Sequence, residues 1–173
     1  MALGLPHQHS GDCDRAADGP AAAQGSAARF HGQSVPPDRW ETVPDRNKSF
    51  SAVAAAKAMH HEHDATQIHE DIAPHDGDII VRKIRYGATS TTDLHEQLAN
   101  RGIDTLILTG ISTSGVVLST LIDVADRDYL VYVLSDGVAD RDPEIHQVLV
   151  HKVFPTRAHV IDTAGLHDLL HTT

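Results

Sequence analysis

The segment 105–120, TLILTGISTSGVVLST, holds the residues whose types and order best suggest chemistry. Its first part, 105–108, is a short apolar run typical of a buried strand, and a helix is predicted to begin a few residues later. Ligands of α/β proteins bind beyond the carboxyl ends of parallel strands, and the unpaired N–H groups at a helix start favour an anion. The segment therefore predicts a ligand site, although Val116 stands where a nucleophile would be expected.

Apolar and amphipathic segments alternate along the chain and predict the elements that position this site. The predicted strands are 78–81, 105–108, 129–134 and 159–161. The predicted helices are 91–100, 113–127, one that begins at Asp142, and 163–171, with a short Ala-rich helix inside 48–63 and a loop over 68–78. Nearly all-apolar strands that alternate with helices predict a mostly parallel sheet covered on both faces. We therefore expect a three-layer α/β/α, Rossmann-like fold.

Local signals fix several helix ends. Thr91 or Thr92 is expected to cap the first of these helices, and Gly102 to end it in the left-handed conformation. Asp142 followed by proline is a strong helix start. The helix that begins at Asp142 carries Ile145, Val148, Leu149 and Val153 on one face, and the last helix carries Leu166, Leu169 and Leu170.

Length and composition limit the classes of protein. At 173 residues, of which 40 % are hydrophobic, the chain is long enough for one domain with a substantial core. Its net charge of −10 argues against nucleic acid or an anionic membrane as a partner. The chain has neither an apolar run of the roughly 20 residues that span a bilayer nor a secretory signal. The lone cysteine, Cys13, fits a reducing compartment, so we expect a cytoplasmic protein.

Residues 1–43 differ in composition from the rest of the chain. They are rich in Ala, Gly, Pro, Asp, Gln and His, contain no Ile, and show neither helical nor strand periodicity. We therefore divide the chain into an atypical, poorly ordered arm, 1–43, and an α/β domain, 44–173.

Four segments, taken in order, resemble the isochorismatase-like hydrolases, also called the cysteine hydrolase superfamily, which includes nicotinamidases and N-carbamoylsarcosine amidases. The segments are PHDGDIIVRKIRYGATSTTDL (74–94), TLILTGISTSGVVLST (105–120), DVADRDYLVYVLSDGVADRDPEIH (123–146) and KVFPTRAHVID (152–162). The resemblance extends from Asn47 to about Ile161 and implies the same three-layer fold.

The resemblance also implies roles for particular residues. Amidases of this family use an Asp at the end of the first strand, a Lys at the end of a middle strand and a Cys at a helix start. The Lys corresponds to Lys83, and Val116 occupies the position of the Cys. Neither Asp12 nor Asp14 follows an apolar strand, so the first strand is expected to be missing or altered.

The family further has a non-proline cis peptide that shapes an oxyanion site, and the resemblance places it at Ile111-Ser112. The N–H groups around Ser114 to Val116 would hold an oxygen there. The residues of this oxyanion and cis-peptide region are Ile111, Ser112, Thr113, Ser114 and Gly115.

Valine at position 116 excludes one mechanism. Amide hydrolysis through a thioester needs a thiolate and a base, and valine has no lone pair. True isochorismatases lack the cysteine and hydrolyse a vinyl ether by acid catalysis from the first-strand Asp, which tolerates Val116 but needs an acid that the sequence does not reveal.

Other polar residues have structural alternatives. Thr113 and Ser114 are expected to cap a helix rather than attack a substrate, and Ser119 and Thr120 to face the interior. Asp123 and Asp126 could bind a ligand, but ion pairs with Arg127 or with the next loop are favoured. Ligand contact is a minority alternative for Asp136 and Asp140. The histidines could suggest a metal, but their spacing favours a solvated loop, so we expect no metal and no cofactor; they are His60, His61, His63, His69 and His75.

Two functions remain. The first is an isochorismatase-like hydrolase that acts on a small carboxylate- or amide-bearing molecule by a non-cysteine mechanism. The second is a catalytically inactive member that serves as a binding or oligomer-interaction module. Relatives assemble as oligomers, so we expect a homo-oligomer with a small-molecule substrate or ligand and neither nucleic acid nor membrane as partner. Two hypotheses explain residues 1–43: a shifted reading frame, or a truncated paralogue that has lost catalysis.

Overall fold

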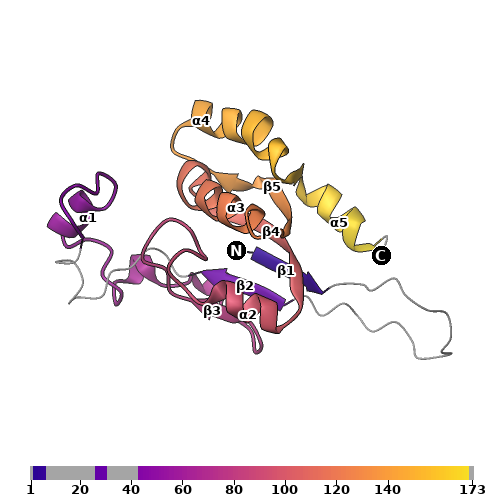
Figure 1. Cartoon of the computed structure of the whole chain (residues 1–173), viewed down its shortest axis with the longest axis horizontal. Coiled ribbons are helices and arrows are strands. Elements are labelled where there is room, and N and C mark those ends of the chain that lie inside the picture. The colour runs from indigo at the N-terminus through magenta and orange to yellow at the C-terminus, as the bar shows by residue number, and fades with distance from the viewer. Residues whose placement is uncertain (1, 7–25, 31–42, 172–173) are drawn as a thin grey trace.

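The protein is built on a six-stranded sheet with strand order β3-β2-β1-β4-β5-β6 (Figure 1). The computed structural model describes residues 2–6, 26–30 and 43–171. The strands are β1 (Ala2–Pro6), β2 (Ser26–Phe30), β3 (Ile79–Val81), β4 (Ile103–Ile111), β5 (Leu130–Ala139) and β6 (His159–Ile161).

Strand direction decides which ends of the strands meet. β2 pairs with β3 in parallel, and β4, β5 and β6 are parallel to one another. β1 is antiparallel to both of its neighbours, β2 and β4. All strands except β1 therefore run the same way, and their carboxyl ends lie along one edge of the sheet. The predicted α/β class with a mostly parallel sheet is confirmed.

Helices connect the parallel strands. The α-helices are α1 (Ser51–Ala55), α2 (Leu94–Asn100), α3 (Leu118–Ala125), α4 (Pro143–Val148) and α5 (Thr163–His171). The π-helical segments are η4 (Thr113–Val117) and η5 (Leu149–Val153), and the 3₁₀ turns are η2 (Asp64–Thr66), η3 (Glu70–Ile72) and η6 (Phe154–Thr156). None of the helices in the described part of the chain has the length and apolar character needed to cross a membrane.

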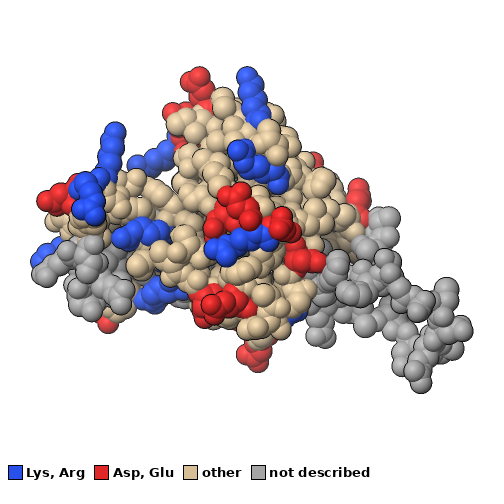
Figure 2. Space-filling view, viewed as in Figure 1, with Lys and Arg blue, Asp and Glu red and all other residues tan. Residues whose placement is uncertain are grey.

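The hydrophobic core lies between the sheet and these helices. Leu98 of α2, Leu121 and Val124 of α3, and Phe154 are completely buried together with Val133 of the sheet. Aliphatic burial of this kind is the main stabilising term of such a domain. On the face shown in Figure 2, basic and acidic side chains alternate over the coloured surface without a continuous patch of one sign.

The local signals in the sequence predict several helix ends correctly. Gly102 has a φ of +64°, the left-handed conformation expected after α2. The cap expected at Thr91 or Thr92 is wrong: the N-cap of α2 is Asp93, whose side chain makes no capping hydrogen bond, although Thr92 Oγ1 accepts one of 3.2 Å from the Leu94 N–H. Asp142 caps α4 by accepting from Glu144 N at 2.9 Å and from Ile145 N at 3.2 Å.

The continuous helix predicted over 113–127 is wrong in detail, because a π-helical turn, η4, precedes α3. A second π-helical segment, η5, follows α4 and shifts the helix face. Ile145 and Val148, both within α4, are 45 % and 42 % exposed, while Leu149, the first residue of η5, is buried. Leu170 of α5 is also exposed.

Of the two alternatives for the first strand, missing or altered, a missing strand is wrong. β1 and β2 fall within residues 1–43, and β1 sits in the middle of the sheet, between β2 and β4. Backbone pairing with neighbouring strands, which periodicity does not reveal, fixes them. Asp12, Cys13 and Asp14 lie outside the described residues, and the division of the chain at residue 43 stays a prediction.

Candidate active site

The turn after β4 has the backbone geometry that the family resemblance implies. The peptide bond between Ile111 and Ser112 is cis, and Ile111 is 76 % exposed. Ser112 Oγ accepts a hydrogen bond of 3.2 Å from the Gly115 N–H, and the Ser112 carbonyl accepts one of 3.1 Å from the Val117 N–H. Ser112 is therefore the N-cap of η4, and the expectation that Thr113 or Ser114 caps this helix is wrong.

Thr113 and Ser114 instead tie the turn to the neighbouring strand–helix unit. Thr113 is fully buried, and its Oγ1 lies 2.9 Å from Nδ1 of His146 on α4. Ser114 donates from its backbone N–H at 2.7 Å and from its hydroxyl at 2.6 Å to Oδ2 of Asp140, directly after β5. These two bonds hold the pKa of the Asp140 carboxyl below its ordinary value.

These contacts change the expected oxyanion site. The N–H groups of Ser114 and Gly115 already donate within the chain, to Asp140 and Ser112. Among the N–H groups of Ser114 to Val116, which were expected to hold an oxygen, the Val116 N–H is the one that takes no part in these two contacts. Val116 itself is half-buried in η4 and offers only methyl groups in the nucleophile position.

Lys83 is the second element of the candidate site. It follows β3 by two residues and is only 2 % exposed. Its Nζ donates a weak hydrogen bond of 3.4 Å to the Arg85 carbonyl, and among the described residues no carboxylate forms an ion pair with it. Burial lowers the pKa of the Lys83 ammonium to about 8. A buried cation without a counterion is unfavourable unless an anion joins it.

The loop after Lys83 packs against the turn that holds Val116. A Cβ placed on Gly115 would lie 3.3 Å from the ring of Tyr86, and this ring lies 4.9 Å from that of Phe50 between centroids. The Ala88 N–H donates at 3.1 Å to the buried Thr120 hydroxyl on α3. The main chain after Lys83 is thus fixed beside η4 and α3, with an aromatic pair at the contact.

Strand direction places the site along one edge of the sheet. Lys83, Ser112 and Asp140 follow the carboxyl ends of β3, β4 and β5, which are parallel to one another in the sheet. β1 runs the other way, and Leu5 pairs with Thr105 near the start of β4. The carboxyl end of β1 therefore lies at the opposite edge, so this strand does not bring an acid to the site in the way that the family resemblance implies.

Other candidates from the sequence have structural partners. Asp123 forms an ion pair with Arg127 at 3.4 Å and also accepts from the Thr89 hydroxyl. Asp136 accepts from the Thr163 N–H at 3.0 Å at the start of α5, which lowers the pKa of its carboxyl. Thr120 is buried as predicted, and Ser119 is half-buried.

His146 and Tyr86 are the residues at this edge that sequence reasoning did not single out. His146 belongs to the helix that Asp142 caps, so its position four residues after a predicted helix start was the available signal. Tyr86 lies in a loop whose path the sequence does not specify.

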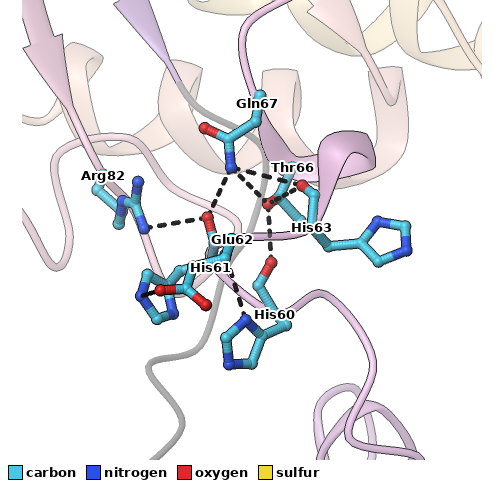
Figure 3. A network of polar contacts seen from close by, with 7 residues as sticks. All are labelled: His60, His61, Glu62, His63, Thr66, Gln67 and Arg82. Carbon is cyan, nitrogen blue, oxygen red and sulfur yellow. Dashed lines mark hydrogen bonds and ion pairs between the residues drawn. The ribbon is translucent and has the colours of Figure 1, made fainter.

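The histidine-rich segment forms a polar network of its own (Figure 3). Thr66 donates to the carbonyls of His60 and His63 at 2.8 and 2.7 Å, and Gln67 donates to the carbonyl of His61 at 2.6 Å. Arg82, next to Lys83, reaches the same His61 carbonyl at 3.4 Å. Within the described residues, no group of three or more His, Cys, Asp or Glu side chains is arranged to hold a metal ion.

The fold and this edge define the class of protein. It is an α/β protein whose candidate site is formed by a lysine, a cis-peptide turn and a helix start at the carboxyl ends of parallel strands. The profile of the isochorismatase domain matches residues 19–165. The chain therefore belongs to the isochorismatase domain family, and the match begins within the segment that looks atypical from composition.

Individual relatives agree with this assignment. The ureidoacrylate amidohydrolase RutB of Methylobacterium radiotolerans is 35 % identical over 100 residues, which are 57 % of this chain and 39 % of that protein. RutB of Pseudomonas syringae is 38 % identical over 81 residues, 47 % of this chain and 33 % of that protein. The chain thus matches less than half the length of these relatives.

Solved structures show the same fold. A cysteine hydrolase from Pseudomonas syringae pv. phaseolicola superimposes with a TM-score of 0.76 at 23 % identity, over 87 % of this chain and 74 % of that one. The N-carbamoylsarcosine amidase of Thermoplasma acidophilum gives a TM-score of 0.59 at 26 % identity, over 77 % of this chain and 69 % of that one.

Proposed function

We propose that this protein is an isochorismatase-family hydrolase that acts on a small molecule without a cysteine nucleophile. The observation that carries the proposal is the buried, uncompensated Lys83 at the sheet edge shared with the Ile111-Ser112 turn. Val116 cannot form a covalent intermediate, so the attacking group in this proposal is water. Lys83 binds the anionic group of the substrate, and the Val116 amide faces the oxygen on which charge develops.

The names of two relatives indicate the substrate class. Ureidoacrylate and N-carbamoylsarcosine both join a ureido group to a carboxylate on a short carbon chain. A buried ammonium at the site is suited to such a carboxylate, because a charge-assisted hydrogen bond is strongest away from water. We therefore propose a small ureido- or amide-bearing carboxylate as substrate.

Hydrolysis of a panel of ureido carboxylates, amides and vinyl ethers tests the proposal. We expect turnover by the native chain that survives Cys13→Ser and alkylation by iodoacetamide but is lost in Lys83→Met. Lys48→Met, at an exposed lysine, is the matched control and should leave turnover unchanged. Loss of activity on alkylation, or full activity in Lys83→Met, would contradict the proposal.

A catalytically inactive binding module is the second candidate, and the contact between Ser114 and Asp140 favours it. The Asp140 carboxylate accepts a hydrogen bond from the Ser114 N–H, which could otherwise stabilise an oxyanion. Val116→Cys distinguishes the two functions. If the native chain is inactive on the whole panel and the variant gains amide hydrolysis, the site binds substrates but lacks a nucleophile. If the native chain turns over a substrate, the inactive module is excluded.

We also propose a homo-oligomeric state and a cytoplasmic location, as the family resemblance and the composition imply. Light scattering coupled to size-exclusion chromatography measures the first. A monomeric mass over the working concentration range would contradict it.

A further inference from the structure

A pair of histidines on α5 lies outside the candidate active site. His167 and His171 are four residues apart, which places them one above the other on the same face of the helix. Both side chains are exposed. Their Nε2 atoms are 3.0 Å apart, and the ring centroids are 4.1 Å apart with an interplanar angle of 59°.

This spacing is the one that a transition-metal ion requires of two adjacent ligands. Imidazole nitrogens bind such ions at about 2.1 Å, so two of them at an angle of about 90° are about 3.0 Å from each other. Two histidines separated by one helical turn are also a known arrangement for zinc on a helix face. The two Nε2 atoms are therefore already at the separation that a shared ion needs, and the rings have to turn so that both lone pairs face it.

We propose that His167 and His171 form a two-histidine site for a divalent transition-metal ion, with water in the remaining coordination positions. This differs from the expectation of no metal, which considered the histidines of residues 60–75. In the free protein, one Nε2 carries the proton of the hydrogen bond between the rings. When the metal binds, that proton moves to Nδ1 of the same ring, and both Nε2 lone pairs coordinate the ion.

The chemistry of the donors defines the ions. Neutral imidazole suits Cu²⁺, Ni²⁺, Co²⁺ and Zn²⁺, while Mg²⁺ and Ca²⁺ prefer oxygen ligands. The affinity should be greatest for Cu²⁺ and greater for Ni²⁺ than for Co²⁺. No third His, Cys, Asp or Glu of the described residues joins the pair, so the site is open to solvent and to exchange of the ion.

Calorimetric titration of the full chain with NiCl₂ tests the site. Both His167→Ala and His171→Ala should remove one bound Ni²⁺ per chain or weaken it by about tenfold or more, because each leaves a single ligand. The double variant, which leaves no ligand of the pair, should bind Ni²⁺ at least as weakly as either single one. His75→Ala is the control, since it removes an equally exposed histidine outside the pair.

A spectroscopic measurement separates coordination from an indirect effect on the helix. Electron paramagnetic resonance of Cu²⁺ bound to the native chain should show coupling to two imidazole nitrogens, reduced in either variant while circular dichroism keeps the native helix signal. Unchanged Ni²⁺ stoichiometry and affinity in both variants, or an equal loss in His75→Ala, would overturn the proposal. Because these measurements do not use hydrolysis, they are independent of the proposed function.

Discussion

The two parts of the candidate active site differ in how their polar groups are satisfied. In the turn after β4, Ser112 caps the helix, Thr113 contacts His146, and Ser114 donates twice to Asp140. Lys83, after β3, is buried, and its one hydrogen bond within the described part of the chain is a long contact to a backbone carbonyl.

The polar groups of the β4 turn therefore stabilise the site itself, whereas the Lys83 ammonium is available to a ligand. Hydrogen bonds within the turn fix its shape and leave little capacity for a substrate. An uncompensated buried cation lowers stability and is kept most easily when it has a role in binding. The turn after β4 thus provides a rigid frame for the site, and Lys83 provides the group that recognises a ligand.

Replacement of Lys83 by Met should have the largest effect. The unfolded chain keeps the proton on Lys83 up to a pKa near 10.5 and the folded chain only up to about 8, so the penalty is full below pH 8 and disappears as the pH rises toward 10.5. Lys83→Met should therefore stabilise the protein at pH 7 by up to about 3 kcal/mol and remove this pH dependence.

The same substitution should weaken binding of a carboxylate ligand by about 2 to 5 kcal/mol. Urea unfolding at pH 7 and pH 10 measures stability, and ligand titration measures affinity. Lys48→Met should change neither. A destabilised Lys83→Met chain that binds normally would reverse the roles assigned to the two regions.

Replacement of Asp140 by Ala should cost about 1 to 3 kcal/mol of stability, because the amide and hydroxyl of Ser114 lose their acceptor. Asp136→Ala removes a comparable carboxylate that accepts from Thr163 on α5, and it should cost less stability, because Asp136 is exposed to solvent. Only Asp140→Ala should change ligand affinity. If the two variants changed ligand affinity equally, the contact between Asp140 and Ser114 would not be part of the ligand site.

Replacement of His146 by Ala should cost about 1 kcal/mol by leaving the buried Thr113 hydroxyl without its partner. A double-mutant cycle with Thr113→Val measures the coupling. If the energies of the two single variants simply add, the contact contributes nothing to the rigidity of the turn.

Replacement of Gly115 by Ala should have the smallest effect, about 0.5 to 1 kcal/mol. The new Cβ would lie 2.7 Å from Ser112 Oγ, so the hydroxyl must rotate away from its capping position. In a Ser112→Ala background the same change should cost less, and unfolding measurements on the four chains of the cycle show this directly. A cost unchanged by Ser112→Ala would place the clash at Tyr86 instead.

The sequence predicts the fold after residue 78 well because its signals are local there. Gly102, the Asp142 cap and the apolar strands depend on neighbouring residues, and all are found as expected. β1 and β2 escape prediction because their pairing depends on distant strands. The π-helical segment η5, which replaces the end of the helix predicted from Asp142, has no clear sequence pattern.

For the candidate site, the sequence predicts which residues lie at the sheet edge but not how they contact one another. The family resemblance leads to Lys83 and to the cis bond at Ile111-Ser112, because both are tied to strand ends. It does not reveal that the Asp140 carboxylate accepts a hydrogen bond from the Ser114 N–H, since this contact depends on the path of the loop after β5.

The most direct test of the account is a nuclear magnetic resonance titration of the Lys83 side chain, free and with a bound ureido carboxylate. We expect the free ammonium to titrate with a pKa near 8, and the pKa to rise when the carboxylate binds, because the anion stabilises the charged form. A free pKa near 10.5 that the ligand leaves unchanged would show that Lys83 is neither buried nor part of the site.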